Sequence, residues 1–445
     1  MFNKIIRFTQ SKTEYLYENS LFLKNIDKFI FASIIAVFLA STVMSSDVIG
    51  FIALITVFLT LVKILTKPEE NLSCKTFELW LLAYFMIVVI SLTGSTLFHL
   101  SLKGFFKTFT YLAFYCSTVQ YLKSNKDKIP FIFAAIGLCV SFEAVVGFLQ
   151  NFAHVEEIST WQDVSNLNPE QVMTRVYGTL KPLNPNLLGG YFVAGIPAVY
   201  GLAAYFLNEK NYKRAITALV LALLSTITLF LTGCRGSYIG MMIIMTGMFV
   251  VSAKYLWNNY KHIYLSLVGG VVALVTFAIL LSSSLRARVL SIFAMRQDSS
   301  NSFRFNVYQS SFEMFKDNWL LGIGVGNKNF REIYGLYMKT GFDALSAYNI
   351  YLEIAVESGI FALIAYLGFL ITLIKNSVKF ILKSADTKSV IFVSAALISI
   401  CAVSIHGLVD TVFFRPQIQF IFWTMVAVIS SVLPSPLAGE GRIST

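Results

Sequence analysis

The sequence predicts an all-α fold, namely a polytopic integral membrane protein of about twelve transmembrane helices with one long external loop between spans nine and ten. Three observations support this prediction. Hydrophobic residues make up 56% of the 445 residues and charged residues only 13%, about half the charged share of a soluble domain. The mean hydropathy is +0.69. Apolar runs of roughly 20 residues recur along the chain, and each can cross the hydrocarbon core as a helix.

The apolar runs give the order of the elements. We expect spans near residues 29–46, 48–65, 77–95, 103–122, 130–151, 187–207, 215–232, 236–253, 262–282, 358–375, 388–408 and 415–433. A short polar segment at 152–186 and a long one at 283–351 interrupt the series. Backbone polar groups cannot be left bare in lipid, so these segments must leave the bilayer or line a protein cavity.

The same pattern divides the chain into three parts. We expect a cytoplasmic N-terminal segment at 1–28, a transmembrane domain at 29–433 that includes the external loop at 283–351, and an unstructured cytoplasmic tail at 434–445. The N-terminal segment is basic, aromatic and too polar for a signal peptide, so the first span is expected to be an uncleaved anchor.

The formal net charge of +11 predicts an orientation rather than a nucleic-acid partner. Basic residues fill five loops that share one side of a twelve-span chain; they are Lys63, Lys67, Lys75, Lys123, Lys126, Lys128, Lys210, Lys213, Arg214, Lys254, Lys261, Lys375, Lys379, Lys383 and Lys388. Cytoplasmic loops are enriched in such residues, so both termini are expected to be cytoplasmic and both polar segments external.

The expected external side carries mainly arginine. Its arginines are Arg175, Arg235, Arg286, Arg288, Arg296, Arg304, Arg331 and Arg415. Arginine binds phosphate or carboxylate through two parallel hydrogen bonds, whereas lysine is a solvated point charge. Chance or salt bridges within the loops could explain this bias, and so could an external site for an anionic group such as phosphate.

Cysteine usage gives no indication of a metal or a disulfide framework. Five cysteines are scattered as Cys74, Cys116, Cys139, Cys234 and Cys401, without a CxxC pair or a contiguous Cys/His cluster. We therefore expect no metal and no cofactor.

Two short motifs flank the sixth to eighth spans. In "RVYGTLKPLNPNLLGGY", the Asn184-Pro185-Asn186 turn is expected to start a helix with Asn186 as its N-cap. The following Gly189-Gly190 pair would let another helix approach closely. In "LTGCRGSYIG", Arg235 sits at the apex of a tight turn, either snorkelling to water or holding an anion at the next helix N-terminus.

The long segment is predicted to contain a helix from about 302 to 318 that begins beside Arg304. The run Gly322-x-Gly324-x-Gly326 lacks the context of a nucleotide-binding loop and is expected to be a flexible turn.

The remaining motifs place acidic groups near the membrane. In "SAYNIYLEIAVESG", Glu353 and Glu357 are four residues apart and share one helix face. In "HGLVDTVFFRPQ", His406 and Asp410 have the same spacing and precede Arg415, as either an ion-pair network or a functional site. Glu143 is a further charge inside a predicted span.

These stretches, in this order, resemble the O-antigen ligase/polymerase superfamily over roughly residues 140–420. The stretches "SAYNIYLEIAVESG" and "HGLVDTVFFRPQ" are most similar to the branch often labelled as bicarbonate transporters. The resemblance implies a metal-independent glycosyltransferase in the bacterial inner (plasma) membrane. It would move a glycan from an undecaprenyl-diphosphate donor to a glycan or lipid acceptor, at the outer face and in cell-surface polysaccharide synthesis.

The resemblance also implies roles for particular residues. The arginines that bind the lipid diphosphate in the ligases correspond to Arg235 and Arg304, and we add Arg175 and Arg415 as further diphosphate candidates. Tyr348 stands where the ligases carry a histidine that assists the acceptor hydroxyl, and tyrosine is a poor base at neutral pH. The expected catalytic residues are thus Glu353, His406 and Tyr348, and the supporting residues are Asn184, Asn186, Asn349, Glu357 and Asp410.

Transport of bicarbonate or another small anion is the alternative function. A transport path requires charges at the bilayer midplane, commonly in internal repeats. No clear repeat is present, and the charges gather at the expected outer edge, which favours surface chemistry. A non-catalytic scaffold would leave the outer arginines without a purpose.

Overall fold

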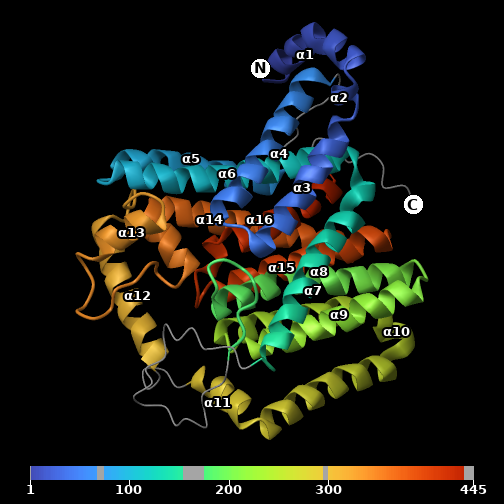
Figure 1. The fold of residues 1–445 in the computed structure, drawn as a ribbon, viewed down its shortest axis with the longest axis vertical. Helices are drawn as coiled ribbons and strands as arrows, with labels where there is room; N and C mark the ends of the chain where they lie inside the picture. The colour runs from blue at the N-terminus through green and yellow to red at the C-terminus, as the bar shows by residue number, and fades with distance from the viewer. Residues whose placement is uncertain (1, 68–74, 154–174, 294–298, 435–445) are drawn as a thin grey trace.

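The computed structural model describes residues 2–67, 75–153, 175–293 and 299–434. Within these ranges the chain is helical and has no strand, which confirms the all-α membrane fold (Figure 1). Most of the shorter polar segment, Arg296 and nearly all of the expected C-terminal tail lie outside the described residues.

A helix lies at each of the twelve predicted spans. The helices are α3 (Ile26–Val43), α4 (Ser46–Thr66), α5 (Thr76–Ser91), α6 (Phe98–Ser124), α7 (Ile129–Gln150), α8 (Pro185–Asn208), α9 (Tyr212–Leu231), α10 (Arg235–Leu281), α14 (Ile350–Lys383), α15 (Thr387–His406) and α16 (Pro416–Val432). The eighth and ninth spans share α10, which is kinked at Tyr260. Ten candidate spans in the described chain are long and apolar enough to cross a membrane. The other two helices are α16, with 17 residues, and the more polar α6, which carries Lys103 and Lys107.

Among the ten candidate spans, α8 and α15 are the most buried, with 83% and 78% of their apolar windows inside the protein. Helix α16 is also buried along nearly its whole length. Helices α5, α6, α14 and α16 lie on one side of α8 and α15, and α9 and α10 lie on the other (Figure 1). Glycines of α8 permit this close packing. A Cβ at Gly195 would stand 2.3 Å from Val140 of α7, and one at Gly201 would stand 2.8 Å from Ala395 of α15. Small residues at such crossings let helix backbones approach within a membrane.

The N-terminal segment folds against the end of α4. Helices α1 (Phe2–Asn19) and α2 (Leu21–Lys24) precede α3. Gln10 Nε2 donates to the Ile64 carbonyl at 2.9 Å, and Thr13 Oγ1 donates to the Leu65 carbonyl at 2.8 Å. These side chains satisfy carbonyls that a helix C-terminus leaves without an intrahelical partner.

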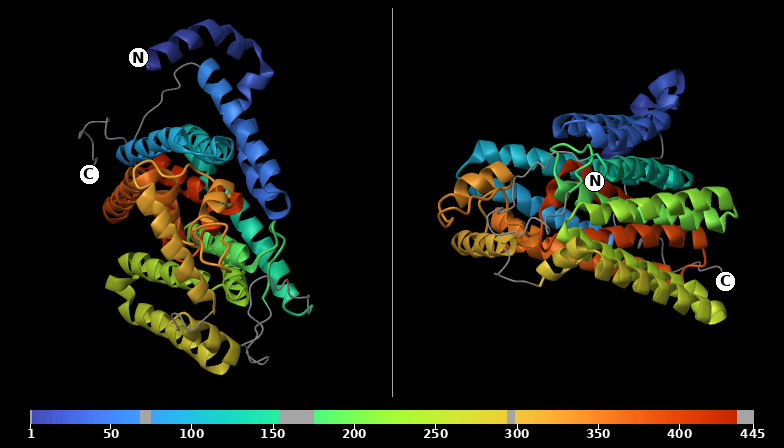
Figure 2. Two further views of the ribbon diagram at one scale, coloured as in Figure 1. Left: turned by 90° about the vertical axis from the view of Figure 1, so that its left-hand side faces the viewer. Right: turned by 60° about the horizontal axis from the view of Figure 1, so that its bottom comes forward.

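The long polar segment forms a small helical layer at one end of the bundle, on the left in Figure 1 and towards the viewer in Figure 2, left. It contains α11 (Ser283–Ser291), α12 (Ser299–Asp317) and α13 (Asn327–Tyr334). Helix α12 confirms the helix predicted at 302–318. The layer has its own apolar core, which includes Val307, Met314, Ile323, Phe330, Tyr334 and Val356.

The glycine-rich turn is packed rather than flexible, contrary to the prediction. Gly322, Gly324 and Gly326 all have positive φ, a conformation that glycine adopts without a steric penalty. The turn pairs with α14, because the N–H groups of Ile323 and Gly324 donate to carbonyls of Val356 and Glu357 at 2.9 Å. Helix α14 is itself broken at Gly359, where φ is 80°. Because α14 is broken there, the carbonyls of Val356 and Glu357 accept from the turn, and these hydrogen bonds hold the turn against the bundle.

Candidate functional site

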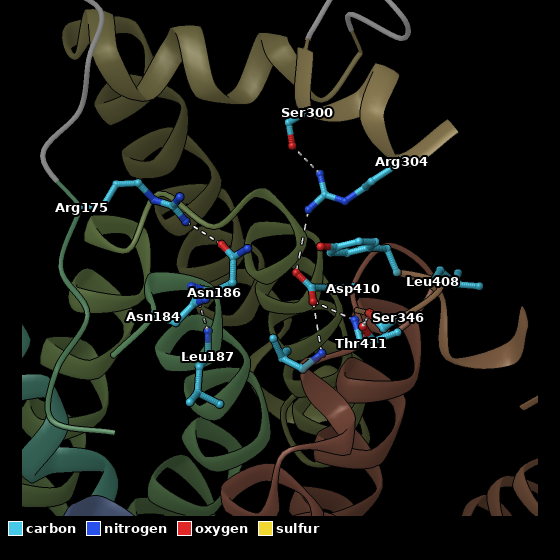
Figure 3. A network of polar contacts seen from close by, with 12 residues as sticks. Arg175, Asn184, Asn186, Leu187, Ser300, Arg304, Ser346, Leu408, Asp410 and Thr411 are labelled. Atoms are coloured by element: carbon cyan, nitrogen blue, oxygen red, sulfur yellow. Dashed lines mark hydrogen bonds and ion pairs between the residues drawn. The ribbon is translucent and has the colours of Figure 1, made fainter. Parts of the chain in front are cut away.

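Arginines from separate parts of the sequence meet at the end of the bundle that carries α11 and α12. Arg175 precedes α8, Arg235 is the first residue of α10, and Arg304 lies on α12. Figure 3 shows Arg175 pointing towards Asn186 and Arg304 pointing towards Asp410. The fold therefore brings three of the four predicted diphosphate-binding arginines into one region.

Arg175 lies over the turn between α9 and α10. Its Nε donates to the Thr232 carbonyl at 2.8 Å, and its Nη2 donates to Asn186 Oδ1 at 2.6 Å. A Cβ at Gly233 would stand 3.2 Å from the Arg175 side chain. Burial lowers the pKa of Arg175, and the nearby positive charges of Arg288 and Arg235 lower it further. The guanidinium groups are thus close enough to repel one another.

The start of α8 corrects one prediction. Asn184, rather than Asn186, is the N-cap, and its Oδ1 accepts from the N–H groups of Asn186 at 2.7 Å and Leu187 at 3.4 Å. Pro185 explains the difference, because the residue before a proline avoids helical backbone angles and proline suits the first helical position. Asn186 is therefore inside the helix, and its side chain is available to hold Arg175.

Arg235 joins the tight turn to the long segment. Its Nη1 contacts Ser291, at 3.3 Å from the carbonyl oxygen and 3.1 Å from Oγ. Gly233 has a φ of 61°, which allows the turn that the sequence predicted between the two spans. Arg235 is also within the first turn of α10, whose free N–H groups favour a nearby anion.

Arg304 approaches the same region from α12. Its Nη1 donates to Ser300 Oγ at 2.9 Å, and its Nη2 is 3.9 Å from Asp410 Oδ2. The guanidinium carbon lies 5.8 Å from the ring centroid of Tyr348. Among the described residues, the buried Nε has no hydrogen-bond partner. Arg304 therefore holds a donor that a bound anion could satisfy.

Asp410 is held in place by its own turn. Its Oδ1 accepts from the N–H groups of Thr411 at 2.7 Å and Val412 at 3.1 Å. The Thr411 hydroxyl also hydrogen-bonds the Ser346 hydroxyl (Figure 3). The second oxygen of Asp410 is consequently fixed in its orientation towards Arg304.

Tyr348 supports Arg304 and is unsuited to be a base. Its φ of 50° is unusual for a residue with a side chain, and its carbonyl accepts from the Tyr308 hydroxyl at 3.2 Å. Burial, and then the charge of Asp410, raise the pKa of Tyr348 to about 12. The phenol is therefore protonated at neutral pH. The next residue, Asn349, is the N-cap of α14 and donates to the Leu408 carbonyl at 3.1 Å.

Glu353 and Glu357 both face inward and hold backbone groups. Glu353 Oε2 accepts from the Ala347 N–H at 3.1 Å, and Glu357 Oε1 accepts from the Gly326 N–H at 2.8 Å. Glu143 does the same in α7, where it accepts from the Thr179 N–H at 2.9 Å. These carboxylates fix the start of α13 and the segments that precede α14 and α8. Glu353 and Glu357 thus hydrogen-bond to backbone N–H groups, and the charge of Arg415 acts on Glu353.

Arg415 precedes α16, and its electrostatic neighbours include Tyr111 and Glu353. The structure thus places it by α6 and α14, and the contacts that define the group of Arg175, Arg235 and Arg304 do not involve it.

His406 lies in a buried polar group that the sequence did not indicate. It is the last residue of α15, and its ring nitrogen, the Cys234 sulfur and an Asp410 carboxylate oxygen lie within 4.8 Å of one another. All three side chains are buried. The His406–Asp410 spacing was visible in the sequence. Cys234 was missed because only the packing of α10 against α15 brings it there.

Comparisons with known proteins cover part of the chain. A family model described as O-antigen ligase matches residues 219–367, a range that contains Arg235, Arg304, Tyr348 and Asn349. The teichuronic acid biosynthesis protein TuaE of Bacillus subtilis (strain 168) is 28% identical over 241 residues, which cover 51% of this chain and 47% of that protein. The chain thus matches about half the length of this relative.

Proposed function

We propose that this chain, which belongs to the O-antigen ligase/polymerase superfamily, transfers a glycan from an undecaprenyl-diphosphate donor to a glycan or lipid acceptor. The reaction would take place at the outer face of the bacterial inner membrane, in the synthesis of a cell-surface polysaccharide. The relative TuaE is named as a teichuronic acid biosynthesis protein, which supports this proposal.

The convergence of Arg175, Arg235 and Arg304 carries the proposal. Guanidinium groups brought close together are stabilised by an anion between them. Burial lowers the pKa of Arg175, and the charges of Arg288 and Arg235 lower it further, so a nearby anion would favour its charged form. A diphosphate offers several acceptor oxygens to such groups through charge-assisted hydrogen bonds. The unpartnered Nε of Arg304 would gain a partner on binding.

The arginines would act mainly on the leaving group. In the transfer, the acceptor hydroxyl oxygen bonds to the anomeric carbon, while the bond from that carbon to the diphosphate oxygen breaks. Negative charge then accumulates on the departing lipid diphosphate. Fixed positive groups around that charge lower the barrier, because they stabilise the transition state more than the ground state.

The acceptor hydroxyl also has to lose a proton. Tyr348 is unsuited because its phenol is protonated at neutral pH. Glu353 and Glu357 are occupied by backbone N–H groups. We assign activation of the acceptor to the buried group of Cys234, His406 and Asp410, which adjoins Arg304 through Asp410.

Reconstitution of the full chain tests the function. Liposomes containing the purified protein and a synthetic undecaprenyl-diphosphate glycan are mixed with candidate acceptors, and free undecaprenyl diphosphate is measured. We expect its release to depend on the protein and on the acceptor. A matched donor with a single phosphate should react poorly. Uptake of labelled bicarbonate by the same liposomes, without release of the lipid diphosphate, would instead support an anion transporter.

A further inference from the structure

We propose that the C-terminal half of α12 and the turn after it form an interfacial anchor, which inserts into the membrane leaflet on the side of the long polar segment. The anchor consists of Phe312, Lys316, Trp319 and Leu320. Its three apolar side chains are all exposed, Phe312 at 49% and Trp319 at 52%. Contiguous exposed apolar side chains of this size mark a surface that binds a partner or a membrane.

The direction of α12 suits contact with a membrane surface. The helix runs across the ends of α14 and α15 rather than along them (Figures 1 and 2). Because the spans set the direction of the membrane normal, a helix across their ends lies along the membrane surface. Helices in this position bury one apolar face at the boundary between the lipid head groups and the acyl chains.

Helix α12 has two separate apolar faces. Val307 and Met314 are seven residues apart and belong to the apolar core of the helical layer. Phe312 and Lys316 are four residues apart on another face, and Trp319 follows in the turn after the helix. Folding of the layer therefore uses the first face and leaves the second exposed.

The anchor continues the lipid-facing surface of the spans. The carbonyl of Trp319 accepts from the Ile360 N–H at 2.9 Å, at the start of the apolar part of α14, and the next residue of α14, Phe361, is exposed. A Cβ at Gly94, just after α5, would stand 3.3 Å from the Leu321 side chain. An exposed phenylalanine on a spanning helix faces lipid, and the lipid that covers Phe361 also reaches Trp319.

The residue types of the anchor match the boundary of a membrane. Tryptophan is enriched at the level of the head groups, because its ring is apolar and its N–H is polar. The Nζ of Lys316 lies 4.8 Å from the centroid of the Phe312 ring. A lysine whose stem follows an apolar surface can place its ammonium among lipid phosphates. This combination favours phospholipid, rather than a second protein, as the partner.

The consequence for activity rests on the proposed function. Arg304 and Phe312 both lie on α12, about 12 Å apart along its axis at 1.5 Å per residue. A helix that lies along the membrane surface keeps the two residues at a similar depth, so the anchor would hold Arg304 at the level of the head groups. A diphosphate joined to a lipid lies at that level as well.

Quenching of tryptophan fluorescence tests the anchor directly. The full-length protein is reconstituted into lipid nanodiscs, and the emission of Trp319→Phe is subtracted from that of the wild type. We expect lipids with bromine near the head group to remove most of this difference, and iodide in the water to remove little of it. A difference quenched by iodide alone would place Trp319 in water, and one that neither quencher changes would place it against protein. Either result would overturn the proposal.

The depth of the bromine provides a second reading on the same two proteins. Lipids with bromine at the chain ends should quench the difference less than lipids with bromine near the head group, because an interfacial indole lies shallow. Stronger quenching from the chain ends would contradict an interfacial position.

Leu336→Trp in the Trp319→Phe background is the matched control. Leu336 follows α13 in the same helical layer and is 84% exposed. We expect its indole to be quenched by iodide and not by brominated lipid. None of these measurements uses glycan transfer, so failure of the anchor and failure of the proposed function are separate results.

Discussion

At the scale of single residues, the structure changes the role of Tyr348. The family resemblance puts it where a catalytic histidine is expected, whereas the structure places its ring beneath the guanidinium of Arg304 at 5.8 Å. Phe303 packs edge-on against the same ring. Tyr348 therefore supports Arg304, which we propose binds the substrate, through its aromatic face.

Two substitutions at Tyr348 distinguish the contribution of the aromatic ring from that of the hydroxyl. Tyr348→Phe should keep most of the transfer activity, because the ring that supports Arg304 remains. Tyr348→Ala should lose about tenfold, since a partly buried cation–π contact contributes roughly 1–2 kcal/mol. Rates of lipid diphosphate release in liposomes measure both. Equal loss in the two variants would show that the hydroxyl itself is needed.

The pH dependence of the transfer rate provides a second test of Tyr348. The pKa of Tyr348 is raised to about 12 by burial and by Asp410. A raised phenol pKa stabilises the fold while the group is protonated, and that contribution is lost only as the pH rises from about 10 through the folded value. Between about pH 6 and pH 9, Tyr348→Phe should therefore have the same pH–rate profile as the wild type. A profile that changes in this range would contradict the assignment.

At the scale of elements, buried carboxylates join the long segment to the bundle. Glu357 holds the Gly326 N–H, and Glu353 holds the Ala347 N–H. Both acids lie on the first part of α14, before its break at Gly359. The broken helix thus fixes the glycine-rich turn and the segment that carries Tyr348.

A matched pair of substitutions at Glu357 tests this role. Glu357→Gln retains an oxygen that can accept from Gly326, so it should fold with near-normal stability. Glu357→Ala leaves a buried N–H without a partner, which should cost about 1–3 kcal/mol. Thermal unfolding of the purified variants in detergent provides the measurement. Equal losses in the two variants, which both lack the charge, would indicate that the negative charge rather than the hydrogen bond to Gly326 is what matters.

The elements were predictable from sequence to different degrees. The spans were predictable because a segment in lipid must form all its backbone hydrogen bonds internally, as a helix does. An apolar run of sufficient length therefore predicts a membrane-spanning helix. The N-cap of α8 lies two residues before the predicted one, because Pro185 keeps Asn184 out of helical backbone angles and itself occupies the first helical position. The group of Cys234, His406 and Asp410 could not be predicted, because it depends on how α10 and α15 pack.

At the scale of the whole molecule, Arg235 contacts Ser291 of α11 and Arg304 lies on α12. These two helices lie at one end of the bundle (Figure 1). The proposed function requires this end to face outward, towards the lipid-linked donor and the acceptor. The lysine-rich loops would then face the cytoplasm, in agreement with the distribution of positive charge in membrane proteins.

Cysteine labelling tests this orientation. Thr340 in the long segment and Ala385 between α14 and α15 are both exposed. We expect a membrane-impermeant maleimide to label Thr340→Cys in intact spheroplasts and to label Ala385→Cys only after lysis. The unsubstituted protein provides the background from native cysteines. The reverse labelling pattern would put the arginines on the cytoplasmic side and contradict the proposed topology.

The most direct test of the central claim is release of undecaprenyl diphosphate by arginine variants in the reconstituted assay. The control is Arg331→Ala, which removes an exposed arginine that pairs with Asp343 at 2.7 Å. We predict that Arg235→Ala and Arg304→Ala each lose at least about 100-fold in rate, as expected for removal of a group that stabilises the transition state. Arg331→Ala should retain the wild-type rate. Wild-type release by both Arg235→Ala and Arg304→Ala would contradict the account.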